Sequence, residues 1–101
     1  MVGAESFIAV YMLASRRHGT LYIGVTSDLI SRVAAHRDGA FEGFTKRYGV
    51  TRLVWFETHD SIVEAIRREK QLKKYRRDWK IKLIERDNPN WDDLFPALLG
   101  P

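Results

Sequence analysis

Five side chains of this sequence interrupt otherwise apolar patterns and are of types that carry out proton-transfer, phosphate-binding or metal chemistry. They are Tyr11, Tyr22, Arg32, His36 and Glu69. Histidine moves a proton near neutral pH, arginine holds a phosphate through two parallel hydrogen bonds, and a carboxylate binds hard cations. Phosphodiester hydrolysis needs a base, positive charge and a metal ion, so the set contains a candidate for each role.

Glu69 lies inside the apolar stripe of a predicted helix. The stripe is made by residues at helical spacing, namely Ile62, Ala65, Ile66 and Leu72. A carboxylate directed at a core is costly unless it is paired or binds a cation. Two interpretations of Glu69 therefore stand side by side: an internal salt bridge to an arginine, and a metal ligand.

The other four residues fall on neighbouring elements. Arg32 and His36 are four positions apart, on one face of an earlier predicted helix. Tyr11 and Tyr22 lie on the two strands of a predicted hairpin, where their hydroxyls can converge. Taken singly, such a histidine is more often a structural hydrogen bonder, and aromatic residues in strands are usually part of the core.

The elements that must position these side chains follow from the hydrophobic patterns. Apolar or alternating runs predict strands over residues 7–14, 21–25 and 52–57. Helices are predicted from residue 29 to about 38, from 62 to 75 and from 77 to 86, with residues 39–50 as a loop that holds three glycines. The order β-β-α-β-α-α predicts an α+β fold, a three-stranded antiparallel sheet flanked by helices.

Local signals support the helix boundaries. The run Thr26-Ser27-Asp28 supplies N-cap chemistry for the first helix, and Ser61 with Glu64 forms a capping box at the start of the second. In the third helix, Trp79, Leu83 and Ile84 are expected on one side.

Composition limits the classes of protein to consider. With 101 residues, positions 1–101 are expected to form one domain, in which a shallow surface site suits a polymer better than a deep cavity does. The absence of cysteine excludes disulfides, thiolate catalysis and zinc–thiolate sites. No apolar stretch approaches the ~20 residues that span a membrane, and no signal peptide is evident, so a cytoplasmic protein is expected.

Positive charge is concentrated in one segment. Residues 67–82 hold nine lysines and arginines against two acids, a local charge of +7, whereas the whole chain carries +4. Such a stripe is typical of proteins that bind a polyanion, although it also fits a solvated helix face. The stripe residues proposed to contact substrate are Lys70, Lys73, Lys74 and Arg77.

At these residues the chain resembles the GIY-YIG nuclease family. The first family motif is represented by Val10-Tyr11 and the second by Tyr22-Ile23-Gly24. The segment from Val25 to Arg32 resembles the next block, in which an arginine opens a helix, and residues 64–73 resemble the block whose second glutamate binds the metal. The resemblance covers roughly residues 7–95 and is greatest to short, single-domain bacterial members.

The resemblance implies a one-metal hydrolysis of phosphodiester bonds, with DNA favoured over RNA as the substrate. Tyr11 or His36 would activate water and Tyr22 would assist. Arg32 would hold the phosphate, and Glu69 would bind Mg²⁺ or Mn²⁺ at the leaving oxygen. Without a separate recognition domain, sequence specificity would come from a protein partner, a homodimer or the shape of the substrate.

Three positions depart from the family pattern or leave a role open. Ala9-Val10 replaces the glycine and isoleucine of the first motif, and Val25 stands where DNA-repair relatives carry a lysine. Residues of the glycine-rich loop are candidates for the missing substrate contact, namely Lys46, Arg47 and Tyr48. Either Asn88 or Asn90 corresponds to an asparagine that members use late in the domain.

Two other classes of function fit the same sequence. One is a nucleic-acid-binding module that keeps the fold without catalysis, and the other is a small interaction protein whose basic helix binds an acidic partner. Metal-dependent cleavage of DNA separates them, because the enzyme cuts, the module only shifts the DNA, and the interaction protein does neither.

Overall fold

A computed structural model of the chain describes residues 7–39 and 43–100. Its elements in chain order are β1 (Ala9–Ala14), β2 (Leu21–Thr26), α1 (Leu29–Arg37), α2 (Phe44–Arg47), β3 (Arg52–Thr58), α3 (Ile62–Lys73), α4 (Arg77–Asp87) and α5 (Phe95–Leu98). The three strands form one antiparallel sheet in the order β2-β1-β3. The predicted α+β fold with a three-stranded antiparallel sheet is therefore confirmed.

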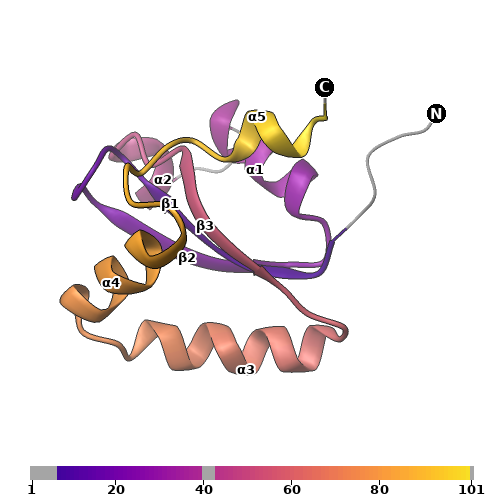
Figure 1. The fold of residues 1–101 in the computed structure, drawn as a ribbon. Helices are drawn as coiled ribbons and strands as arrows, with labels where there is room; N and C mark the ends of the chain where they lie inside the picture. The colour runs from indigo at the N-terminus through magenta and orange to yellow at the C-terminus, as the bar shows by residue number, and fades with distance from the viewer. Residues whose placement is uncertain (1–6, 40–42, 101) are drawn as a thin grey trace.

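Strand β1 is the centre of the sheet, and helices cover both of its faces (Figure 1). All six of its side chains are buried, which explains why its sequence is continuously apolar rather than alternating. The hairpin from β1 to β2 closes with a hydrogen bond from the Ser15 amide to the Thr20 carbonyl. Its register places Tyr11 opposite Gly24 and Leu13 opposite Tyr22.

Successive side chains of β1 point to opposite faces of the sheet and so divide the interior into two clusters, one on each face. The Tyr11 face holds Ala9, Tyr11 and Leu13, which pack with buried residues of α1 and half-buried residues of α5. The Met12 face holds Val10, Met12 and Ala14, which pack with residues of α3 and α4. Figure 1 shows α1 and α5 on one side of the sheet and α3 on the other.

A short helix, α2, lies within the segment predicted as a loop, so that prediction was wrong for Phe44–Arg47; residues 40–42 lie outside the described residues. Gly43 and Gly49 flank α2 with positive φ angles of 98° and 63°, which glycine adopts without strain. The Val50 amide donates to the Thr45 carbonyl. Glycines that suggested a loop therefore mark the two ends of one helical turn.

The C-terminal part of the chain also differs from the prediction. Helix α5 was not predicted; Pro96 lies in its first turn, a position that suits proline, and the Asp93 carboxylate accepts the Phe95 amide. Helix α3 ends at Lys73, two residues earlier than expected, because its last turn tightens and the Tyr75 amide bonds to the Leu72 carbonyl.

The predicted apolar stripe of α3 is buried only in part. Ala65 and Leu72 lie in the core, whereas Ile62 and Ile66 are exposed. The buried residues are one full heptad apart, so α3 touches the sheet along a narrower line than the sequence suggested. On α4, Ile84 is buried and Leu83 is half-buried, whereas Trp79 is exposed.

Candidate active site

Tyr11 and His36 meet in the interior of the Tyr11 face. Tyr11 is on the central strand and His36 is in the last turn of α1, and the Tyr11 hydroxyl lies 3.0 Å from His36 Nε2. Both residues are buried. A hydrogen bond between a phenol and an imidazole is a route for a proton, and its burial keeps bulk water from competing for it.

Thr45 of α2 holds the other nitrogen of the histidine ring. Its hydroxyl lies 3.2 Å from His36 Nδ1, and Thr45 itself is buried. Sequence analysis missed this residue, because a single threonine in a segment without periodicity gave no signal. The three side chains form a chain from Tyr11 through the His36 ring to Thr45.

Tyr22 and Gly24 complete the surroundings of the Tyr11 ring. The Tyr22 ring lies 6.2 Å from the Tyr11 ring and 5.4 Å from the His36 ring, measured between centroids. Tyr22 is half-buried, so it is the more accessible of the two tyrosines. A Cβ at Gly24 would lie 2.5 Å from the Tyr11 hydroxyl oxygen, so the glycine is required for Tyr11 to cross the neighbouring strand.

Arg32 lies one helical turn before His36 on α1 and is half-buried. Arg32 and Tyr22 both lie close enough to the Tyr11 hydroxyl to influence its pKa. The structure therefore brings together four of the five residues that the sequence singled out: two tyrosines, an arginine and a histidine.

The environment sets the protonation states of this cluster. Burial raises the pKa of Tyr11 above its ordinary value, and Tyr22 adds to this while the charge of Arg32 opposes it. Burial lowers the pKa of His36, and the positive charge of Arg32 lowers it further. At neutral pH Tyr11 is thus a phenol and His36 a neutral imidazole, which in one of its two tautomers accepts from Tyr11 at Nε2 and donates to Thr45 from Nδ1.

Glu69 lies elsewhere. It is on α3, whose buried residues Ala65 and Leu72 belong to the Met12 face, so Glu69 and the tyrosines lie on elements that pack on opposite faces of the sheet. The Glu69 side chain is 14% exposed, and its carboxylate lies 2.9 Å from Lys73 Nζ. The salt bridge foreseen as one interpretation is present, but its partner is a lysine one turn away rather than an arginine.

Helix α3 packs against β2 as well as β1, and β2 is one of the two edge strands of the sheet. The described residues contain no group of three or more histidine, cysteine or acidic side chains able to hold a metal ion. Mg²⁺ does not require such a group, since it keeps several waters and is often held by one or two carboxylates. Glu69 fits that role because its carboxylate is mostly buried and its ion-pair partner, Lys73, is half-exposed and replaceable by a cation.

The predicted substrate-binding residues divide into three groups. On α2, Lys46, Arg47 and Tyr48 are exposed, with the Arg47 guanidinium 5.5 Å from the centre of the Tyr48 ring. On and after α3, Lys70, Lys73 and Lys74 are exposed, although Lys73 pairs with Glu69.

Arg77 forms the third group and differs from the rest. Its guanidinium donates to the carbonyls of His18 and Gly19, both at 2.7 Å. These bonds tie the start of α4 to the β1–β2 hairpin, so Arg77 has a structural role that the sequence did not reveal.

The two candidate asparagines also separate. Asn88 is buried, and its side chain donates to the carbonyls of Val54 and Asp92 and accepts the Asp92 amide. It therefore fixes the turn after α4 against β3. Asn90 is exposed in the same turn.

A sequence profile described as the GIY-YIG catalytic domain matches residues 7–82, which include the Tyr11–His36 pair, Arg32 and Glu69. The chain belongs to the GIY-YIG family. Members of this kind include a UPF0213 protein of Staphylococcus epidermidis, 37% identical over 67 residues that cover 66% of this chain and 82% of that protein. A UPF0213 protein of Clostridium perfringens is 37% identical over 75 residues, covering 74% of this chain and 80% of its own length.

A solved structure supports the GIY-YIG fold assignment. The solution NMR structure of the UPF0213 protein BH0048 from Bacillus halodurans is 29% identical to this chain, with a TM-score of 0.53. The match covers 85% of this GIY-YIG chain and 90% of that one. Within the part of the chain that the structure describes, no helix has the length and apolar character needed to cross a membrane.

Proposed function

We propose that this GIY-YIG protein is a metal-dependent endonuclease that hydrolyses phosphodiester bonds in DNA. The observation that carries the proposal is the buried hydrogen bond between Tyr11 and a neutral His36, with Arg32 beside it. A core needs no such arrangement for packing. It combines a proton acceptor with a fixed positive charge, which hydrolysis of an anionic ester requires.

Proton transfer is proposed to begin at Tyr22. Tyr22 is the half-buried member of the cluster, whereas Tyr11 is fully enclosed. The attacking water gives its proton to the Tyr22 hydroxyl oxygen, Tyr22 passes its own to Tyr11, and Tyr11 passes its own to His36 Nε2. This assignment makes His36 the final acceptor and Tyr11 the relay, which decides between the two bases left open by the sequence.

Arg32 is proposed to bind the scissile phosphate. Its guanidinium has five N–H donors, so contact with Tyr11 leaves others for phosphate oxygens. Its positive charge also keeps His36 neutral before the reaction. One group therefore attracts the substrate and prepares the base.

Glu69 is proposed to hold Mg²⁺ or Mn²⁺, which when bound supplies positive charge for the leaving oxygen. Glu69 and the tyrosines lie on elements that pack on opposite faces, so the two parts can serve one phosphate only at the edge formed by β2. The DNA backbone is therefore proposed to run along this edge, with Arg32 reaching it from one side and Glu69 from the other.

The test is cleavage of supercoiled plasmid DNA by the whole chain with Mg²⁺ or Mn²⁺, and with EDTA as a blank. Cleavage is expected only with metal, and Tyr11→Phe and His36→Gln are each expected to reduce it by roughly 10²-fold or more, the usual contribution of a proton-transfer group. Wild-type protein that retards the plasmid but never cuts it would overturn the proposal.

A second candidate, a nucleic-acid-binding module without catalysis, is favoured by one observation. The Glu69 carboxylate already pairs with Lys73, and an ammonium in that place satisfies the acid without a metal. The plasmid experiment separates the two functions, since a module retards DNA equally with Mg²⁺ and with EDTA.

A further inference from the structure

Trp79 is the exposed tryptophan of this chain. Trp55 and Trp91 are buried, whereas Trp79 on α4 has 52% of its surface exposed. A large aromatic side chain left in water loses the stabilisation that its burial would give. Its exposure therefore marks a candidate contact surface.

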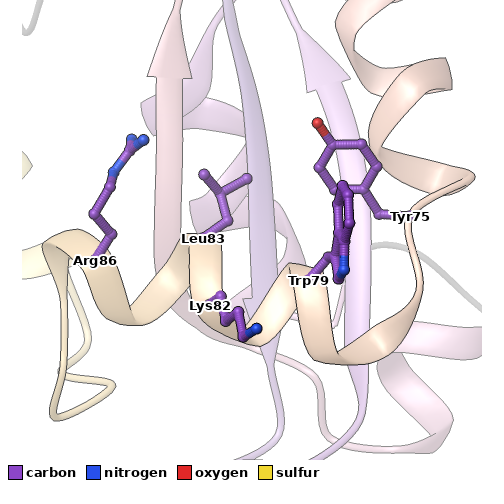
Figure 2. A pocket seen from close by; sticks show the side chains of 5 residues that line it. All are labelled: Tyr75, Trp79, Lys82, Leu83 and Arg86. Atoms are coloured by element: carbon purple, nitrogen blue, oxygen red, sulfur yellow. The ribbon is translucent and has the colours of Figure 1, made fainter.

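The surroundings of Trp79 form a groove. The groove has a volume of about 360 Å³ and is lined by Tyr75, Trp79, Lys82, Leu83 and Arg86 (Figure 2). The Tyr75 and Trp79 rings meet edge to face, with centroids 5.5 Å apart and planes at 77°. The Tyr75 ring therefore packs against the indole from one side and leaves the rest of Trp79 exposed.

Cations surround this aromatic pair. Lys82 and Arg86 line the groove itself, and a second hollow that shares Tyr75 and Trp79 is lined by Lys74 and Arg76.

Two of these cations have acidic neighbours. Arg86 pairs with Asp87 and Arg76 pairs with Asp78, and all four side chains are largely exposed. Exposed pairs of this kind are weak and exchange readily with another anion. Positive charge therefore remains in excess around the groove.

We propose that this groove binds an unpaired base of single-stranded nucleic acid, stacked on Trp79, with neighbouring phosphates on Lys82 and Lys74. An aromatic platform flanked by cations is the arrangement by which proteins hold single strands without sequence preference. In a duplex each base is already stacked on its neighbours, so duplex DNA gains little from the indole. The excess of positive charge disfavours a second copy of this basic chain as the occupant.

The groove is distinct from the candidate active site. Helix α4 packs on the Met12 face, so Trp79 is across the sheet from the Tyr11–His36 pair. The inference rests on the proposed function only in taking nucleic acid as the ligand. It adds that the substrate contains a single-stranded stretch, which the groove holds while the active site acts elsewhere on the strand.

The experiment measures binding of a fluorescein-labelled oligothymidylate of roughly 12 nucleotides, a length within the usual range for single-strand sites, to the whole chain in EDTA. Iodide can quench the emission of the exposed Trp79 but not that of Trp55 and Trp91, which are buried. Binding of oligothymidylate is expected to quench this same iodide-accessible emission. Trp79→Ala is expected to weaken binding by about tenfold, and Trp79→Phe, which keeps a ring, by less.

Two controls make the result specific. Leu99→Ala removes another exposed apolar side chain, located after α5 at the other face, and should leave binding unchanged. Duplex of the same length should lose far less affinity in Trp79→Ala than the single strand does. Equal loss for both, or wild-type affinity of Trp79→Ala for oligothymidylate, overturns the proposal.

Two further outcomes would also overturn it. One is a wild-type chain that does not bind oligothymidylate, and the other is a wild-type dimer that becomes a monomer in Trp79→Ala by analytical ultracentrifugation. Plasmid cleavage with Mg²⁺ is scored separately on the same proteins. Cleavage without single-strand binding therefore rejects only the proposed single-strand site, and single-strand binding without cleavage rejects only the proposed endonuclease function.

Discussion

The two faces of the sheet differ in how they treat polar groups. On the Tyr11 face, a phenol, an imidazole and a hydroxyl are buried and bonded to one another. On the Met12 face, the buried cluster includes Val54, whose carbonyl accepts from the buried amide of Asn88, a group that does not ionise, and the charged residues of α3 and α4 lie outside the cluster. One face can therefore hold fixed protonation states, whereas the other presents charges that solvent and ligands can reach.

This division gives the proposed enzyme two parts that differ in how much displacement of their side chains they tolerate. Residues of the Tyr11 face act through fixed positions, because close-packed interiors do not adjust smoothly. Residues of α3 and α4 act through charge, which tolerates movement. Substitutions on the first face should therefore alter turnover, and most substitutions on the second should alter binding.

Glu69 is the exception that tests this comparison most severely. Glu69→Gln keeps the shape of the side chain and removes its charge, so it is expected to reduce metal-dependent cleavage by roughly 10²-fold or more although the residue belongs to the binding face. Its fold, measured by circular dichroism, should be unchanged. Single-turnover cleavage of a labelled DNA measures the effect.

Glu64→Gln is the matched control, because Glu64 is an exposed acid five residues earlier on the same helix. It should keep activity and lose at most about 1 kcal/mol of stability as a first-turn acid near the helix N-terminus. Similar cleavage by the two variants would remove Glu69 from the proposed mechanism.

The next largest effect is expected from Gly24→Ala on the Tyr11 face. The added methyl group would lie 2.5 Å from the Tyr11 hydroxyl oxygen and its ring carbon, so the ring must move away from His36. Overpacking of this kind costs about 1–3 kcal/mol, and cleavage should fall with it. Chemical denaturation measures the first effect and plasmid cleavage the second; a variant equal to wild type in both would show that Tyr11 does not need its present position.

A smaller effect is expected from Thr45→Val. Removing the hydroxyl leaves His36 Nδ1–H without its partner, which favours the tautomer that donates to Tyr11 instead of accepting from it. The turnover number should fall by about tenfold, as expected for the loss of one buried hydrogen bond, while KM stays the same. Thr45→Ser should restore turnover, and a change in KM alone would argue against a positioning role.

The pH profile of the wild type gives a second measure of the same interaction. Neutral His36 is the proposed acceptor, so activity is present above its pKa and is lost as pH falls through it. Burial and Arg32 lower that pKa below its ordinary value of 6.5. The acid limb of the rate profile should therefore lie below pH 6.5, and a limb above that value would contradict the assignment of His36.

Patterns within single elements were predictable from the sequence, and relations between elements were less so. The apolar run of β1 predicted a strand covered on both faces, and the four-residue spacing of Arg32 and His36 predicted their shared side of α1. Helical spacing also predicted that Glu69 turns inward, but nothing in that spacing specified the face of the sheet on which α3 packs.

The residues that the sequence missed share a physical cause. Thr45 gains its role only because α2 folds back over His36, a contact that local propensity does not encode. Trp79 was expected on the same side of its helix as Leu83 and Ile84, yet Ile84 is buried and Trp79 is exposed. In both cases tertiary contact, and not the local pattern, decides what the side chain does.

The smallest effect on turnover is expected from removing charge at α3, which tests whether the Met12 face contributes binding alone. Lys73 is unsuitable for this test because it pairs with Glu69, so the informative variant is Lys70→Ala combined with Lys74→Ala, both exposed. Each lysine that contacts a duplex phosphate releases counterions and contributes about −0.9 to the slope of log affinity against log salt. The double variant should flatten that slope by about one to two units and leave the turnover number at saturating DNA unchanged.

Titrations of a fluorescent duplex at several salt concentrations measure the slope. If neither slope nor affinity changes, the stripe is a solvated helix face and DNA binding belongs to the α2 residues beside His36.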